Sequence, residues 1–178
     1  SGDTEPTINA IFQIEHTDNG GPYTVTFENV KFAPAATGNV ITEQSINATS
    51  AESVNKLVIE NCEFELSATN STGLGAVVAV TATEQNGHYA TGAQLTFCNN
   101  TVRTTSYQQG GSGFYTAVVD TSATSSTLYG PDVYNFAKHT IANNTIQGHF
   151  YYAFIGGYAD FTGNRVDLKY YTGTDNET

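Results

Sequence analysis

The stretch Leu95-Thr96-Phe97-Cys98-Asn99-Asn100-Thr101-Val102 carries a pattern that recurs along the chain. Apolar residues stand at its first, third and eighth positions, and Asn stands at the fifth. Alternation over the first three positions is typical of a half-buried strand, since successive side chains of a strand point to opposite faces. We expect the Asn to keep the inward parity and to bend the chain, because Asn tolerates unusual φ and bonds nearby backbone groups.

This eight-residue frame occurs five times, with first residues at 25, 57, 95, 139 and 159. The other four copies are Val25/Phe27/Asn29/Phe32, Leu57/Ile59/Asn61/Phe64, His139/Ile141/Asn143/Ile146 and, with Gly163 and Asn164 at the Asn step, Ala159/Phe161/Val166. The spacings of 32, 38, 44 and 20 residues indicate a solenoid whose loops vary in length. Abundant Thr, Val, Tyr and Asn favour strands and turns over helices. We therefore predict an all-β solenoid with an internal ladder formed by Asn29, Asn61, Asn99 and Asn143.

The frame, as in Leu57-Val-Ile-Glu-Asn-Cys-Glu-Phe64, resembles that of the right-handed parallel β-helix proteins of the pectin-lyase-like superfamily, in its adhesin-like branch. The resemblance covers roughly residues 8–170. It implies one right-handed parallel β-helix domain of about five coils, with polar tails at 1–6 and 172–178. It implies no single activity, because lyases, glycoside hydrolases and non-catalytic surface adhesins are all described on this scaffold.

Segments between the frames predict further strands and the connecting loops. We expect a first strand over 8–14, a short strand at 39–41, and strands at 76–80 and 115–119. The aromatic segment 149–154 links the fourth frame to the fifth. Polar or Gly-rich composition predicts variable loops at 42–54, 67–73, 81–92, 103–113 and 120–136.

The charge balance limits the partners of this chain. Its 17 acidic and 6 basic residues give a net charge of −11, which disfavours nucleic acid and anionic membrane surfaces. The sequence has no apolar run of about 18 residues, so it predicts no membrane insertion. We expect an extracellular or cell-surface location. Because neither end shows a cap, we also expect the chain to be a segment of a larger surface protein with flanking domains.

Two features raise the question of a metal or a disulfide. Glu28 and Glu60 share an outward column, where paired carboxylates indicate either a Ca²⁺ site or a solvated acidic surface. Two carboxylates are few for calcium, so we assign no metal and no cofactor. Cys62 and Cys98 lie in neighbouring frames, and the sequence leaves open whether they are bridged.

No complete catalytic set is visible. The basic residues Lys31, Lys56, Arg103, Lys138, Arg165 and Lys169 are scattered along the chain. Glycoside hydrolysis needs convergent carboxylates, whereas Asp120, Asp132 and Asp160 are isolated. His139 occupies an inward frame position, which favours a hydrogen-bonded core histidine over a functional one. We therefore assign no catalytic residue.

Aromatic residues are the most suggestive candidates for binding, with 11 Tyr, 10 Phe and no Trp. Tyrosines in loops or beside Gly can stack on sugars, although they can equally cover the edges of the core. The candidates are Tyr89, Tyr107, Tyr115, Tyr129, Tyr134 and Tyr151. We expect a non-catalytic, adhesin-like module that binds a glycan or a host surface protein through loops on one side. The alternatives are a carbohydrate-active enzyme or its inactive remnant, and a simple spacer.

Five Asn-x-Ser/Thr sequons, at Asn47, Asn70, Asn99, Asn143 and Asn176, invite the question of N-glycosylation. We expect Asn99 and Asn143 to be internal ladder residues. On that interpretation these two sequons are by-products of the repeat and not glycan acceptors.

Overall fold

Three parallel β-sheets make up the part of the chain that the structure describes, which is residues 6–16, 23–34, 38–46, 55–67, 75–83, 93–106, 115–121, 138–156 and 158–168 of a computed structural model. Sheet A contains β1 (Thr7–Ile8), β4 (Lys31–Phe32), β7 (Glu63–Ser67), β10 (Thr101–Ser106), β13 (Thr145–Gly148) and β16 (Arg165–Leu168). Sheet B contains β2 (Phe12–His16), β5 (Ile41–Ile46), β8 (Val78–Thr83), β11 (Tyr115–Asp120) and β14 (Phe150–Ile155). Sheet C contains β3 (Thr24–Glu28), β6 (Lys56–Glu60), β9 (Gln94–Cys98), β12 (His139–Ala142) and β15 (Ala159–Thr162).

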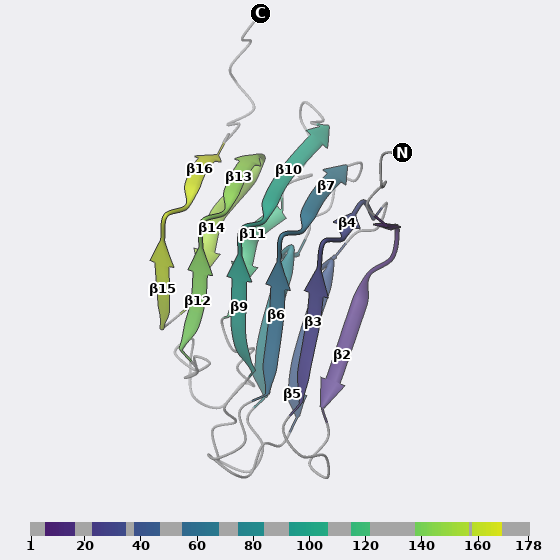
Figure 1. The fold of residues 1–178 in the computed structure, drawn as a ribbon, viewed down its shortest axis with the longest axis vertical. Helices are drawn as coiled ribbons and strands as arrows, with labels where there is room; N and C mark the ends of the chain where they lie inside the picture. Colours follow the sequence, from purple (N-terminus) through teal and green to yellow (C-terminus); the bar gives the residue numbers. More distant parts are fainter. Residues whose placement is uncertain are drawn as a thin grey trace, which may run out of the picture.

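The chain visits the sheets in turn, so strands that pair are three apart in chain order. Figure 1 shows the resulting stack, which runs from β2 and β3 at one end to β15 and β16 at the other. The pairs are parallel and in register, as in Val25 opposite Leu57 and Leu57 opposite Leu95. Equivalent frame positions therefore form columns along the stack. These features confirm the prediction of an all-β parallel β-helix.

The core consists of the inward columns. Phe32 and Phe64 are fully buried and stack with ring centroids 4.8 Å apart and an interplanar angle of 11°. Phe97 continues the cluster, with its centroid 5.9 Å from that of Phe64. Full burial of one such side chain contributes about 1.5–3 kcal/mol. The first, third and eighth frame positions form one part of the apolar core, and inward residues of sheet B such as Ile41, Val78 and Phe150 complete it.

The predicted Asn ladder is wrong by one residue. Asn29, Asn61, Asn99 and Asn143 have φ between 54° and 58° and are exposed. This left-handed conformation is costly for most L-residues and is visited by Asn and Gly. It interrupts the extended backbone, so the alternation of inward and outward side chains along the strand is broken at the corner. The fifth residue therefore turns outward, and the sequons at Asn99 and Asn143 are not internal.

The residue after each corner points into the solenoid. This column consists of Val30, Cys62, Asn100, Asn144 and Asn164. Each of its three asparagines donates from Nδ2 to a backbone carbonyl of the preceding coil, namely those of Ile59, Phe97 and Ile141, at 2.8–2.9 Å. Their Oδ1 atoms accept from the backbone N–H groups of Cys62, Asn100 and Asn144, at 2.8–2.9 Å. The ladder thus satisfies buried backbone groups that the corner removes from the sheets.

Several predicted boundaries also differ. The expected strand over 8–14 is two strands, β1 and β2. Three loops were expected to start at 42, 81 and 103, but β5, β8 and β10 extend to Ile46, Thr83 and Ser106. Polar side chains misled the assignment at β5, where Glu43 is fully buried and accepts a 2.7 Å hydrogen bond from the Tyr23 hydroxyl. That bond and burial raise the pKa of Tyr23, burial being the larger cause.

The two cysteines are not bridged. Cys98 precedes the corner at Asn99 and is half-buried, whereas Cys62 follows the corner at Asn61 and is buried. The two thiols therefore belong to different columns, one on each side of a corner. Burial raises the pKa of the Cys98 thiol.

Within the described ranges no helical segment has the length and hydropathy needed to cross a membrane.

Replacing Asn144 with Ala should lower the free energy of unfolding by about 2–4 kcal/mol, because the Asn100 N–H and the Phe97 carbonyl would lose buried partners. The matched control is Asn143→Gly, which should change stability by less than about 1 kcal/mol, since Gly accepts a φ of 58°. Urea unfolding measures both. A larger loss at position 143 than at 144 would contradict the corrected ladder.

Candidate functional site

A polar groove of about 290 Å³ lies on the outer side of sheet A, near the C-terminal ends of its last strands. Its lining consists of Arg103, Thr104, Gln147, Gly148, His149 and Asp167. Arg103 is the register partner of Gln147, and Gln147 is the register partner of Asp167. Because neighbouring strands are about 4.8 Å apart, three different polar groups stand in a row across β10, β13 and β16. We call this site the Arg103–Asp167 groove.

Gly148 lines the groove and lies close against Thr104 of the neighbouring strand. Gly148 has a φ of +121°, and a Cβ at this position would overlap the Oγ1 atom of Thr104. That same Oγ1 accepts a 2.9 Å hydrogen bond from the backbone N–H of His149. A glycine and a threonine on adjacent strands therefore hold the turn after β13 close against β10.

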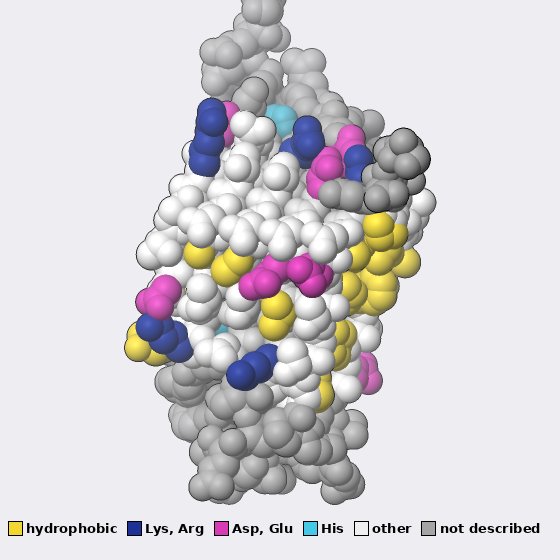
Figure 2. Space-filling view, in the orientation of Figure 1, with side chains coloured by type: hydrophobic (Ala, Val, Ile, Leu, Met, Phe, Trp, Pro, Cys, Tyr) yellow, Lys and Arg dark blue, Asp and Glu magenta, His cyan; other side chains and the backbone are white. Residues whose placement is uncertain are grey.

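An ion-pair network holds Arg103 at one end of the groove. Its Nη2 atom donates to Glu63 Oε1 at 2.7 Å, and Lys31 Nζ lies 3.6 Å from the same oxygen. Lys31 also pairs with Glu65, whose hydrogen bond raises the pKa of Lys31. Figure 2 shows these acidic and basic side chains gathered together on the face it presents. Exposed pairs add about 0–1 kcal/mol each, so the network orients Arg103 more than it stabilises the fold.

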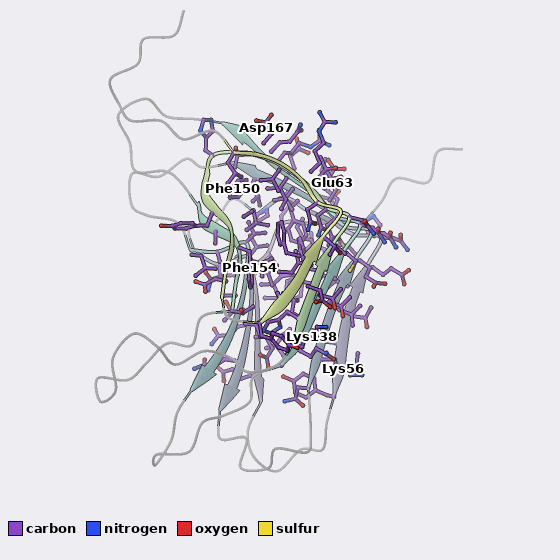
Figure 3. All side chains as sticks on the ribbon, turned by 90° about the vertical axis from the view of Figure 1, so that its left-hand side faces the viewer. Lys56, Glu63, Lys138, Phe150, Phe154 and Asp167 are labelled. Carbon is purple, nitrogen blue, oxygen red and sulfur yellow. The ribbon has the colours of Figure 1, made fainter. Side chains whose placement is uncertain are left out.

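The groove offers complementary hydrogen-bonding groups. Arg103 supplies N–H donors, Asp167 supplies carboxylate acceptors, and Gln147 supplies both. Figure 3, which looks onto the C-terminal end of the solenoid, labels Asp167 and also Glu63 of the ion-pair network. Such a set suits a ligand rich in hydroxyl groups, which both donate and accept. It carries no excess of one charge that would demand an ionic ligand.

The side chains of the six tyrosines proposed from the sequence lie outside the part of the chain that the structure describes. Tyr89, Tyr107, Tyr129 and Tyr134 lie outside the described residues. The backbones of Tyr115 and Tyr151 belong to β11 and β14, which are neighbours in sheet B. Their side chains also fall outside the described part. Their role in binding therefore stays a prediction.

Two exposed tyrosines were missed by the sequence reasoning. Tyr152 is 54% exposed and Tyr158 is 59% exposed. Lys138 Nζ lies 5.7 Å from the centre of the Tyr158 ring and 2.7 Å from Asp160 Oδ2. The hydrogen bond to Asp160 raises the pKa of Lys138. Tyr158, Lys138 and Asp160 lie at the starts of β12 and β15, the last two strands of sheet C. The sequence feature that could have indicated this cluster is the position of Tyr158 directly before the fifth frame.

The weak metal candidates do lie side by side. Glu28 and Glu60 are register partners on sheet C, as the repeat predicted. No three His, Cys, Asp or Glu side chains within the described ranges converge in a way that could hold an ion. Glu28 is exposed and Glu60 is half-buried. We therefore build no function on a metal at this position.

His139 is a core residue, as the sequence indicated. It is fully buried, and its Nδ1 atom accepts a 3.1 Å hydrogen bond from the backbone N–H of Leu95. Burial lowers the pKa of His139 to about 4, so the ring is neutral at physiological pH. Because Nδ1 is the acceptor, the proton resides on Nε2, which has no partner among the described residues. The ring helps to join β9 to β12 and has no part in the groove.

Searches against family models, curated proteins and solved structures find no match for this chain. Any assignment of function must therefore come from the groove itself.

The buried ring of His139 should make stability depend on pH. The unfolded chain binds a proton near pH 6.5, whereas the folded one does so only near pH 4. The contribution of neutral His139 to the free energy of unfolding should therefore be fully present above pH 6.5 and should be lost as the pH falls toward 4. At pH 5 the loss from this group is about 2 kcal/mol.

The test compares wild type with His139→Asn, which can keep an acceptor facing Leu95 but does not titrate. Urea unfolding at pH 7.5 and at pH 5 should show a loss about 2 kcal/mol smaller in the variant. Other titrating groups act equally on both proteins. Equal pH dependence in the two would rule out a depressed pKa at His139.

Proposed function

We propose that this chain is a non-catalytic, extracellular β-helix module of the pectin-lyase-like superfamily, of the adhesin-like kind, which binds glycans in the Arg103–Asp167 groove. The observation that carries the proposal is the row of guanidinium, amide and carboxylate groups on three consecutive strands. A β-helix holds such a row rigidly, because each strand is fixed in register by its neighbours. A pre-formed site loses little entropy when a ligand binds.

The size and charge of the groove define the ligand class. A volume of about 290 Å³ is at the lower end for small-molecule sites, which suits one or two sugar rings of a longer chain. The mixture of donors and acceptors favours neutral sugars with neighbouring hydroxyl groups. The net charge of −11 is also compatible with a secreted or surface-displayed protein and disfavours a nucleic-acid partner.

Binding is favoured over hydrolysis by the composition of the groove. Glycoside hydrolysis uses two carboxyl groups about 5–9.5 Å apart, on either side of the bond that is cleaved. Among the described lining residues, Asp167 supplies the carboxylate, and the nearby Glu63 is engaged by Arg103 and Lys31. A carbohydrate-active enzyme, or its inactive remnant, is the alternative that the experiments must separate.

Gln147→Ala should weaken glycan binding about tenfold, since the amide makes one or two hydrogen bonds to the ligand. A glycan array of neutral and acidic oligosaccharides first identifies a ligand, and isothermal titration then measures the dissociation constant. The matched control is Gln13→Ala, an exposed glutamine on sheet B. It should bind as wild type does. Equal affinity of all three proteins would exclude the groove as the binding site.

The enzyme alternative is tested on the same ligands. Wild type is incubated with pectins and related glycans, with and without Ca²⁺, and the release of new chain ends is followed. We expect binding without turnover. Robust depolymerisation that is lost in Asp167→Asn would replace the binding proposal by a catalytic one.

A further inference from the structure

Two of the corner asparagines carry a chemical signal that the solenoid itself does not use. Asn99 and Asn143 each begin an Asn-Asn-Thr triplet. Such a triplet is the acceptor sequence for N-linked glycans, which are attached to Asn side chains on the surface of secreted proteins. Both asparagines are exposed, with φ of 57° and 58°. The reason for excluding these two sequons, an internal position, therefore does not hold.

The fold explains the first two residues of each triplet but not the third. The corner needs a residue that accepts a left-handed backbone, and the ladder uses the amide of Asn100 or Asn144. The third residue begins a strand of sheet A. In the other coils this position holds Lys31, Glu63 and Arg165. The repeat therefore does not dictate Thr101 and Thr145, the residues that complete the two sequons.

A sugar on a corner amide would leave the contacts of the fold intact. At the two corners the backbone N–H groups of Asn99 and Asn143 donate to the next coil, to the carbonyls of Ala142 and Thr162, at 3.0 Å. The buried ladder bonds belong to the residue that follows each corner. N-linked glycosylation replaces one hydrogen of the Asn Nδ2 and changes neither of these groups. The corner amide can therefore be modified without a loss of buried hydrogen bonds.

The neighbours of the two corners favour Asn143 over Asn99. Corner residues of adjacent coils are about 4.8 Å apart, which is less than the width of a sugar ring with its hydroxyl groups. Asn99 stands between Asn61 and Asn143. Asn143 stands between Asn99 and Gly163, and a Cβ at 163 would overlap the Asn143 Oδ1 atom. One neighbour of Asn143 therefore brings no side chain that would compete with an attached sugar.

We propose that Asn143, at the corner between β12 and β13 (Figure 1), is the acceptor of an N-linked glycan. An oligosaccharyl transferase joins Asn143 Nδ2 to C1 of the first sugar of a lipid diphosphate-linked oligosaccharide. The C1–O bond to the diphosphate breaks, the lipid diphosphate leaves with the electron pair, and a base of the transferase takes one proton from Nδ2. This assignment rests on the extracellular location proposed above, because the donor serves the secretory route, and not on glycan binding in the Arg103–Asp167 groove.

The full chain, expressed in a eukaryotic cell line behind a heterologous signal peptide, provides the test. Protein is collected from both the medium and the cells, so poor secretion does not hide the modification. Trypsin cleaves after Lys138 and Arg165, and the peptide 139–165 contains Asn143 and no other sequon. Peptide N-glycosidase in ¹⁸O water converts a glycosylated Asn into labelled Asp, which mass spectrometry detects. We expect the label at Asn143. An unlabelled Asn143, whether or not Asn99 carries the label, would overturn the proposal.

Two variants at Thr145 show whether the sequon is responsible. Thr145→Ala removes the hydroxyl that the sequon requires and should abolish the label at Asn143. Thr145→Ser keeps that hydroxyl and should retain the label. Persistence of the label in Thr145→Ala would overturn the assignment. Glycan binding is measured separately on unglycosylated protein from a bacterial host, with Gln147→Ala, so failure at Asn143 and failure of the groove give different results.

Discussion

One residue per coil in the left-handed backbone conformation decides which side chains enter the core. Asn29, Asn61, Asn99, Asn143 and Gly163 all have φ between 54° and 64°. At each of these corners the chain passes from sheet C to sheet A. Asn and Gly carry the smallest penalty for this conformation, so the identity of the corner residue follows from the backbone and not from any contact of its side chain.

The corner has a cost that the next residue offsets. Backbone groups near the bend lose partners in the sheets, and a buried unpaired group costs about 1–3 kcal/mol. Asn100, Asn144 and Asn164 supply a donor and an acceptor at this place, so their coils remain satisfied. Earlier in the chain Val30 and Cys62 occupy the column, and the Cys62 Sγ lies 3.3 Å from the Glu60 carbonyl oxygen. The amide ladder is therefore a property of the later coils.

The sequence predicted the fold and the outward columns well, because both follow from strand parity within a frame. Glu28 and Glu60 are register partners, as expected, and Lys31 with Glu63 follows the same rule. The ladder was misplaced because parity was carried through a corner where the backbone is not extended. Gly163 before Asn164 was the available signal, since glycine at the corner position shows that a backbone conformation is needed there and not an amide.

The candidate site was harder to predict for two physical reasons. The row of Arg103, Gln147 and Asp167 lies eight residues after the frame starts, beyond the positions that were compared. The groove also depends on a tertiary contact between Gly148 and Thr104, which no local pattern encodes. Tyrosines in long segments carry no periodicity, so their positions in space could not be deduced. Glu43 was assigned to a loop because its partner, Tyr23, lies 20 residues earlier, directly before β3.

The stacking of coils also determines how the molecule would respond to a pulling force. The first and last strands lie at opposite ends of the stack, and the hydrogen bonds between coils run along it (Figure 1). Tension on the two ends would load these bonds a few at a time, so coils would peel from the ends one after another. Each frame-to-frame unit contains between 20 and 44 residues. Peeling one unit would lengthen the chain by roughly 70 to 150 Å, which makes the solenoid an extensible tether that yields in steps.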